Sequence, residues 1–180
     1  TTFEAPDYRA ESIVRRIAGG ELSVSKQLGS FYISAAYTYL WARVRIRDNW
    51  YNALNQMNYL VKSLVSYTNP TWGKFSLALL ANPGLAYTPI IGGFSTPEQT
   101  IPLWGEYGAA HYNAYQTLDF SYNKVWFLNE RSMLILFASV RNILDRQNQN
   151  RALYAPDYSQ RTDWRHYGRR VFYLGLSYNF

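Results

Sequence analysis

The chain has 180 residues and a formal net charge of +6, and aromatic residues make up 18% of it, with 17 Tyr, 9 Phe and 6 Trp. Its longest apolar run, 133–138, is far shorter than the roughly 18 residues of a membrane-spanning helix, and the absence of cysteine excludes disulfides and thiolate metal sites. This length suits either one domain or about a third of a large barrel.

Positive charge is concentrated in three arginine-rich segments, 43–47, 141–151 and 161–170. A basic surface raises nucleic acid as a partner, but these segments lie beside expected loops, so we expect no nucleic acid partner. The polar sequence after Thr1 lacks the charged and apolar regions of a signal peptide. We therefore expect a mature chain or a fragment.

Apolar and polar residues alternate along most of the chain, which predicts an all-β fold. In the first expected strand, Leu22 and Val24 alternate with Glu21, Ser23 and Ser25. The strand at 132–145 alternates less cleanly, so the sequence does not assign which of its residues belong to the apolar face. We expect seven strands, at 20–26, 31–47, 59–67, from 75 towards 89, at 117–123, 132–145 and 171–180.

The connections between these strands alternate in length. Turns at 27–30, 69–74 and 128–131 are short, whereas the segment 48–58 is longer and the loops 90–114 and 146–169 are long. Outer-membrane barrels have short periplasmic turns and long extracellular loops. The pattern therefore predicts a transmembrane antiparallel β-barrel in the bacterial outer membrane.

Seven strands are an odd number, and a complete single-chain bacterial barrel has an even number. An open sheet in lipid would also leave two unpaired edges. We therefore expect about seven C-terminal strands of a larger barrel. One alternative stays open: a further strand within residues 1–17 would complete an eight-stranded barrel.

The last strand alternates without interruption from Phe172 to Phe180. It resembles the C-terminal signal that the barrel assembly machinery reads, with Gly175, Tyr178 and Phe180 at the matching offsets. The resemblance implies that this machinery is a partner of the chain.

More of the chain resembles the end of a TonB-dependent receptor, particularly of the Bacteroidota members of that family. The resemblance starts at about Gly19 and is carried by 118–121 (Leu-Asp-Phe-Ser), by 141–146 (Arg-Asn-Ile-Leu-Asp-Arg), and by 20–22, 26–30 and 37–39. It implies a barrel of about 22 strands around an N-terminal plug, importing a bulky nutrient with energy passed on by TonB. Residues 1–180 are then the C-terminal part of the outer-membrane barrel domain, without the plug and the earlier strands.

The barrel interpretation assigns roles to aromatic and charged residues. One expected face carries Tyr37, Tyr39 and Trp41 near one end and Tyr67, Tyr178 and Phe180 near the other, which suits two aromatic girdles. On the same face beyond Trp41, Arg43, Arg45 and Arg47 are candidates for contact with lipopolysaccharide phosphates in the outer-membrane lipid, or extend the strand into solvent. Glu21, Lys62 and Asp119 are expected to face inwards.

The long loops carry many aromatic residues, and we select Trp104, Tyr107, Trp164 and Tyr167 as candidates for ligand contact. The alternative is that these aromatics pack the loops together. With two distant histidines, no cysteine and no catalytic motif, we expect no metal, cofactor or enzyme activity.

Three functions remain in view. The first is a TonB-dependent importer, whose partners would be the rest of its own barrel and plug, TonB and, in some cases, a surface lipoprotein. The second is a small eight-stranded outer-membrane barrel with a structural, adhesive or enzymatic role. The third is a soluble, tyrosine-rich carbohydrate-binding module.

Overall fold

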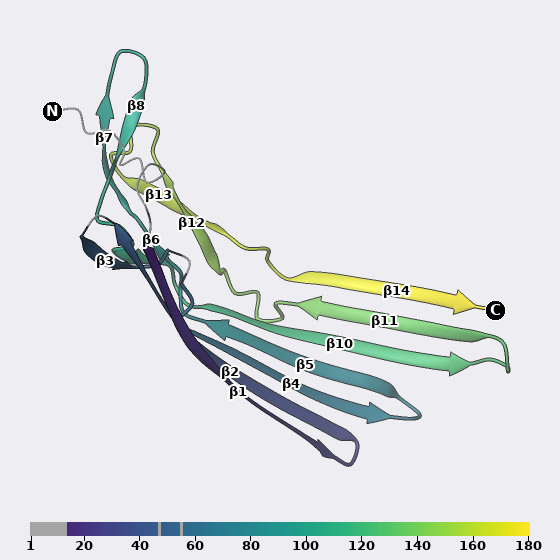
Figure 1. The fold of residues 1–180 in the computed structure, drawn as a ribbon. Coiled ribbons are helices and arrows are strands. Elements are labelled where there is room, and N and C mark those ends of the chain that lie inside the picture. Colours follow the sequence, from purple (N-terminus) through teal and green to yellow (C-terminus); the bar gives the residue numbers. More distant parts are fainter. Residues whose placement is uncertain (1–13, 47, 55) are drawn as a thin grey trace.

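The computed structural model describes residues 14–46, 48–54 and 56–180 (Figure 1). These residues form strands, turns and irregular segments, and the all-β prediction is confirmed. No described segment is a helix with the length and apolar character needed to cross a lipid bilayer. The seven longest strands are β1 (Val14–Leu28), β2 (Phe31–Ile46), β4 (Tyr59–Asn69), β5 (Gly73–Asn82), β10 (Tyr115–Phe127), β11 (Met133–Arg141) and β14 (Val171–Asn179).

These seven strands form one antiparallel sheet, in the order β1-β2-β4-β5-β10-β11-β14. Each therefore lies beside the long strand that follows it in the chain. A short strand, β3 (Asn49–Asn52), pairs with β2 and makes the sheet eight-stranded. The seven predicted strands correspond one to one to the long strands of this sheet.

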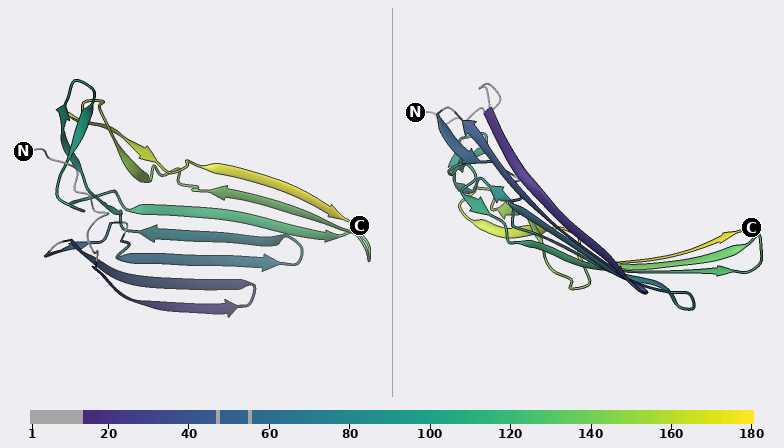
Figure 2. Two further views of the ribbon diagram at one scale, coloured as in Figure 1. Left: turned by 45° about the horizontal axis from the view of Figure 1, so that its top comes forward. Right: turned by 60° about the horizontal axis from the view of Figure 1, so that its bottom comes forward.

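Short turns lie at one end of the sheet and long connections at the other (Figures 1 and 2). We call these the turn end and the loop end. At the turn end, Gly73 has a φ of 97°, and a Cβ there would lie 2.4 Å from the carbonyl oxygen of Asn123. A glycine is needed for this turn to pack against β10. The predicted alternation of short and long connections is confirmed.

The strand register separates the sheet into two faces. One face, which we call the apolar face, carries Leu22, Val24, Ile33, Tyr37, Val61, Val65, Leu77, Leu79, Leu118, Phe120, Leu174 and Leu176. The opposite, polar face carries Glu21, Ser23, Thr38, Lys62, Ser66, Ser76, Thr117 and Asp119. The predicted inward positions of Glu21, Lys62 and Asp119 therefore share one face.

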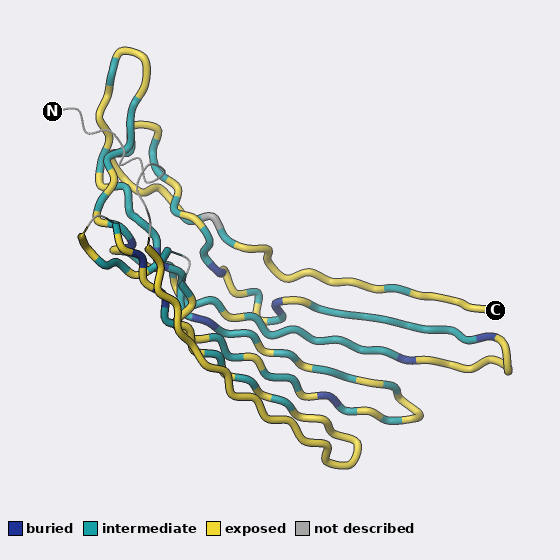
Figure 3. The backbone as a smooth tube through the Cα atoms, in the orientation of Figure 1, coloured by how far each residue is buried: buried dark blue, intermediate teal, exposed yellow. Residues whose placement is uncertain are grey.

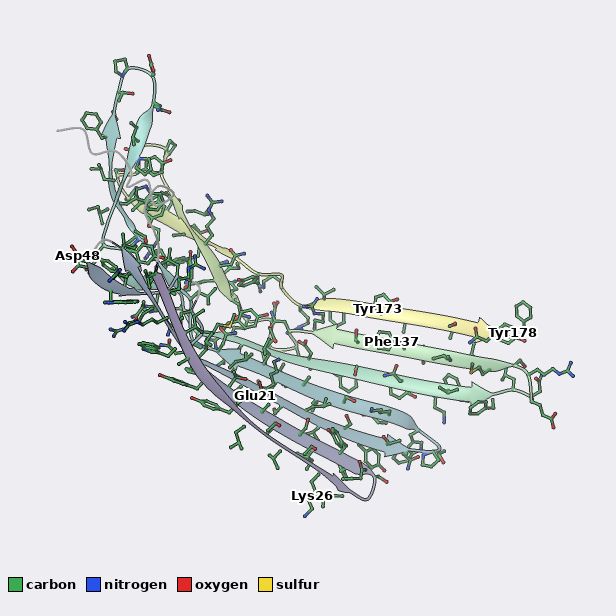
Figure 4. The ribbon with its side chains drawn as sticks, viewed as in Figure 1. Glu21, Lys26, Asp48, Phe137, Tyr173 and Tyr178 are labelled. Carbon is green, nitrogen blue, oxygen red and sulfur yellow. The ribbon has the colours of Figure 1, made fainter. Side chains whose placement is uncertain are left out.

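The register also assigns the faces of β11, which the sequence left open. Leu134 and Leu136 pair with Tyr178 and Leu176 and so lie on the apolar face. Phe137, on the other face, packs against Tyr173 of β14 with ring centroids 5.4 Å apart (Figure 4). Because both faces of β11 carry apolar side chains, alternation alone could not distinguish them.

Aromatic residues border the apolar face at both ends. At the turn end, Phe31, Tyr67, Phe75 and Tyr122 are consecutive partners across four strands, with centroids 4.9, 6.5 and 4.8 Å apart. We call these four residues the turn-side aromatic row. Towards the loop end the loop-side aromatic row comprises Tyr37, Tyr39, Trp41 and Tyr59.

The segments predicted as long loops contain short hairpins, and the loop prediction is wrong for these stretches. They form β7 (Ile90–Ser95) with β8 (Thr100–Trp104) and β12 (Gln149–Tyr154) with β13 (Arg161–His166). In addition, β9 (Ala110–His111) of the first predicted loop pairs with β6 (Ala86–Tyr87), which lies in the expected extension of the fourth strand. Register shifts interrupt the first two hairpins. These shifts, and the Gly-Gly pair at 92–93, hide the alternation in the sequence.

Three predicted strand ends also need correction. β1 begins at Val14, six residues before the expected start, and β5 ends at Asn82. β11 ends at Arg141 because Asn142 and Asp145 adopt positive φ values of 52° and 51°, which stop an extended strand. Most of the segment 1–17, where a further strand would complete an eight-stranded barrel, lies outside the described residues.

Little of the sheet is buried (Figure 3). Ala42, Val44 and Ala86 are the buried apolar residues of the described part, and all lie towards the loop end. The outer edges of β1 and β14 have no partner strand among the described residues. In the described part of the chain, the sheet therefore presents an apolar face and two edges without a partner strand.

Candidate functional site

A pocket of about 880 Å³ lies at the loop end. Segments of both long connections line it, so two parts of the chain that are far apart in sequence form one site. Its aromatic lining residues are Tyr87, Trp104, Tyr107, Tyr112, Tyr154, Tyr158 and Tyr167. Leu54, from the connection after β3, contributes to the wall. We call this site the aromatic pocket.

The two connections contact each other closely around this pocket. The backbone N–H of Ile90 donates to the Tyr154 hydroxyl at 3.1 Å. A Cβ at Gly93 would lie 2.1 Å from the carbonyl oxygen of Asp157, so only glycine permits this approach of the two hairpins. The pocket wall is therefore held in place by contacts between the connections.

Stacked rings form one side of the pocket. Tyr87 and Tyr112 stack with centroids 4.5 Å apart, and the Trp164 ring meets them edge-on at 6.0 and 5.7 Å. The Arg161 guanidinium lies 4.3 Å from the centre of the Trp164 ring. Burial, together with the nearby Tyr87 and Tyr154, raises the pKa of the Tyr112 hydroxyl. Tyr112 therefore stays neutral as an aromatic hydrogen-bonding group.

Three of the four loop aromatics selected from the sequence line this pocket: Trp104, Tyr107 and Tyr167. The fourth, Trp164, packs behind Tyr87 and Tyr112. Tyr107 also contacts Tyr51 of β3, with centroids 5.6 Å apart. The structure thus brings the selected residues together from separate segments, and several of them pack the loops as well as line the pocket.

Sequence reasoning missed Tyr87 and Arg151 as pocket residues. Tyr87 was expected on the extension of a strand, and Arg151 was one of several arginines in a polar segment. Arg151 is the only charged residue in the pocket lining among the described residues. A paired pattern of aromatics in the two long connections was the one sequence signal for this site.

Polar contacts fix the base of the second long connection to the sheet. The buried Asn148 side chain accepts from the Gln116 backbone N–H at 3.0 Å and donates to the Gln116 carbonyl at 2.8 Å. The Asn142 backbone N–H donates to the Asp119 carboxylate at 2.8 Å. The Asn142 side chain donates to the Arg146 carbonyl and accepts from the Arg146 backbone N–H. The motif at 141–146 is therefore a structural junction.

An ion pair closes this junction. Arg169 donates to both carboxylate oxygens of Asp145, at 2.9 and 2.6 Å, and the Arg170 backbone N–H adds a bond of 3.0 Å. The Arg169 guanidinium and then the Arg170 N–H hold the pKa of Asp145 well below its usual range. The pair ties the turn after β11 to the residues that precede β14.

Two of the predicted phosphate-binding arginines, Arg43 and Arg45, lie on the apolar face at the loop end, beyond Trp41. Arg47 lies outside the described residues. The structure adds Arg16 of β1, which is the direct partner of Arg43, and Trp50 of β3, which is the partner of Arg45. Neither was selected from the sequence, although Arg16 continues the alternation of Leu22 and Val24.

The residues of the expected insertion signal lie on different faces of β14. Gly175 is on the polar face, where the Tyr173 ring lies 3.3 Å from the position of a Cβ on this glycine. Tyr178 is on the apolar face, and its ring stacks on Phe180 at 5.9 Å. Their reading by an assembly machinery stays a prediction.

The polar face forms a second hollow, of about 630 Å³, lined in part by Lys62, Asp119 and Arg141. Among the described residues, no three His, Cys, Asp or Glu side chains are grouped to hold a metal ion. No family model, curated protein or solved structure matches the chain.

Proposed function

We propose that the chain forms part of the wall of an outer-membrane β-barrel that imports a bulky nutrient in a TonB-dependent manner. The observation that carries the proposal is the exposed apolar face between two aromatic rows. Leu22, Leu174 and Leu176 on this face are 75%, 73% and 69% exposed. A soluble protein rarely exposes a continuous apolar surface of this extent, whereas a barrel wall presents it to lipid.

The spacing of the aromatic rows supports a lipid-facing wall. Phe31 and Trp41 lie ten residues apart on β2, which corresponds to about 34 Å along a strand. A strand tilt of about 40° reduces this to a height of about 26 Å. The apolar band of outer-membrane barrels is about 25 Å tall.

Further strands are part of the proposal because the sheet has two open edges. In hydrocarbon, each unpaired backbone group costs several kcal/mol, so strands beyond β1 and β14 must complete the hydrogen bonding. The polar face then lines the barrel interior. We propose a barrel of about 22 strands, the size of outer-membrane transporters with a plugged lumen.

The aromatic pocket supports a role in ligand capture. Its volume, of about 880 Å³, is in the usual range for small-molecule sites. It lies at the loop end, with Tyr51 and Leu54 from the β2–β4 connection close to it. The register places Tyr51 opposite Val44, on the polar side of the sheet. In a barrel this position opens towards the lumen.

Two neighbouring positions in β5 test the membrane orientation. Leu79 is on the apolar face and Ala78 on the polar face. With no native cysteine, Leu79→Cys and Ala78→Cys can each carry one fluorophore in the full protein, folded into vesicles of brominated phosphatidylcholine. We expect bromine to quench the probe at 79 strongly and the probe at 78 weakly. Equal weak quenching would support the soluble module instead.

Transport needs a separate test. We expect the precursor to encode a plug domain upstream of Thr1, and energised cells to lose uptake when TonB is deleted. Uptake of radiolabelled oligosaccharides and ferric siderophores measures this directly. A signal peptide directly before Thr1, with quenching at position 79, would support the small barrel instead of the importer.

A further inference from the structure

A cluster of cations lies on the apolar face beyond the loop-side aromatic row. Arg16 of β1 is opposite Arg43 of β2, and Arg45 follows on the same face of β2. Trp50 of β3 pairs with Arg45. We call Arg16, Arg43, Arg45 and Trp50 the arginine patch.

Among the described residues, no counter-charge forms an ion pair with the arginines of this patch. Like charges directly opposite each other on neighbouring strands are destabilising, and Arg16 and Arg43 form such a pair. The nearby turn carries Asp48 (Figure 4), but no ion pair joins it to these arginines within the described residues. An anion bound between the guanidinium groups would remove the repulsion.

Tryptophan rings hold the guanidinium groups in place. The Arg16 and Arg45 guanidinium carbons lie 4.6 and 6.0 Å from the centre of the Trp50 ring, and that of Arg43 lies 5.7 Å from the Trp41 ring. Such cation–π contacts restrict long side chains while leaving their N–H donors free. The three arginines are thus partly ordered before any ligand binds.

The opposite face of the same segment is covered. Ala42 and Val44 are buried there, and Tyr51 contacts Tyr107. The arginine patch therefore points away from the aromatic pocket and from the polar face. A ligand of the patch must come from outside the proposed barrel.

We propose that the arginine patch binds the phosphate groups of a membrane lipid headgroup. This proposal rests on the membrane-spanning function proposed above. Aromatic rows mark the interfaces of a barrel, so the patch lies at headgroup level, one step outside the apolar band. One guanidinium group can donate two parallel hydrogen bonds to the oxygens of a phosphate. The three guanidinium groups of the patch, on two strands, suit a headgroup with two phosphates.

Native mass spectrometry of the full protein, from nanodiscs of phosphatidylcholine with bisphosphorylated lipid A, tests the proposal. The variant combines Arg16→Gln, Arg43→Gln and Arg45→Gln. A control of equal charge change combines Arg15→Gln, Arg131→Gln and Arg170→Gln, since Arg15 is on the polar face and the other two lie outside the patch. We expect at least tenfold weaker lipid A retention in the patch variant and less than twofold loss in the control.

Two further binding measurements identify the ligand of the patch. Lipid A without its phosphates should be retained no better than phosphatidylcholine, and millimolar inorganic phosphate should not displace lipid A. Equal retention by patch variant and control, or displacement by inorganic phosphate, overturns the lipid proposal. The probe at position 79, read in the same bilayers, shows whether the protein has inserted; no quenching there overturns the membrane function as well.

Discussion

The sheet and the loop end of this molecule are stabilised in different ways. On the apolar face of the sheet, large side chains are exposed, and both edges lack partners within the described residues. At the loop end, aromatic rings pack against one another, and buried Asn142 and Asn148 bond their neighbours. Within the described residues the sheet therefore leaves its apolar face and its two outer strands without packing partners, whereas the loop end is held by its own contacts.

A charged side chain on the apolar face should destabilise the sheet. Leu79 lies midway along β5, and Leu79→Arg would place a guanidinium in the middle of the apolar band. We expect a loss of about 2–4 kcal/mol in the free energy of unfolding, the cost of arginine at mid-membrane in barrels. Urea titration of the protein in vesicles, read by heat-modifiable gel mobility, measures this loss.

Ala78→Arg is the matched control for this substitution. It places the same charge one residue away on the polar face, beside the hollow of about 630 Å³. We expect less than about 1 kcal/mol of destabilisation there, as for other surface-like sites. Equal losses at positions 78 and 79 would contradict the assignment of the apolar face to lipid.

At the loop end, the largest effect should come from Asn148. Asn148→Ala removes two hydrogen bonds between its buried side chain and the Gln116 backbone, at a cost of about 1 kcal/mol for each bond. We expect faster hydrogen exchange at the Gln116 amide, which loses its acceptor, and in β12 and β13, with no change in the rest of the sheet. Gln147→Ala, at an exposed neighbouring position, should leave exchange unchanged. Faster exchange throughout β10 would show that the two regions are coupled.

The sheet could be predicted from the sequence because its strands obey one simple rule. Each long strand alternates between an apolar and a polar face, and the turns contain glycine, proline and asparagine. β11 was the exception, since Met133, Ile135 and Phe137 make its second face apolar too. Its true end at Arg141 depends on the positive φ of Asn142, which alternation does not encode.

The loop end was predicted only in part because its structure depends on contacts between distant segments. The sequence identified Trp104, Tyr107, Trp164 and Tyr167 as candidates, but not the edge-on contact of Trp164 with Tyr112 from the other connection. Arg16 was missed for a different reason. β1 extends further towards the loop end than its clear alternation suggests, and pairing with β2 places Arg16 beside Arg43.

Lys124 is an exception to this contrast between the sheet and the loop end, because it is a charged residue on the apolar side of the sheet. Its ammonium group is buried under the β4–β5 turn and donates to the carbonyls of Pro70 and Thr71, at 2.8 and 2.6 Å. Lys124→Met leaves these acceptors unpaired but also removes a buried charge, so we expect a net loss of about 1 kcal/mol. The exposed Lys74→Met is the control for urea titration.

The smallest expected effect concerns the ion pair of Asp145 with Arg169. It tests whether the loop end is held by its own polar contacts. The folded-state pKa of Asp145 is lowered. The stabilisation by the ion pair is therefore fully present above the ordinary pKa of an aspartate, about 3.9, and it is lost as the pH falls through the lowered pKa. We expect Asp145→Asn to reduce hydrogen-exchange protection at the Arg170 amide by the same factor at pH 7 and pH 5. The difference from wild type should begin to shrink only below about pH 4. A difference that already shrinks between pH 7 and pH 5 would mean that another group orders this junction.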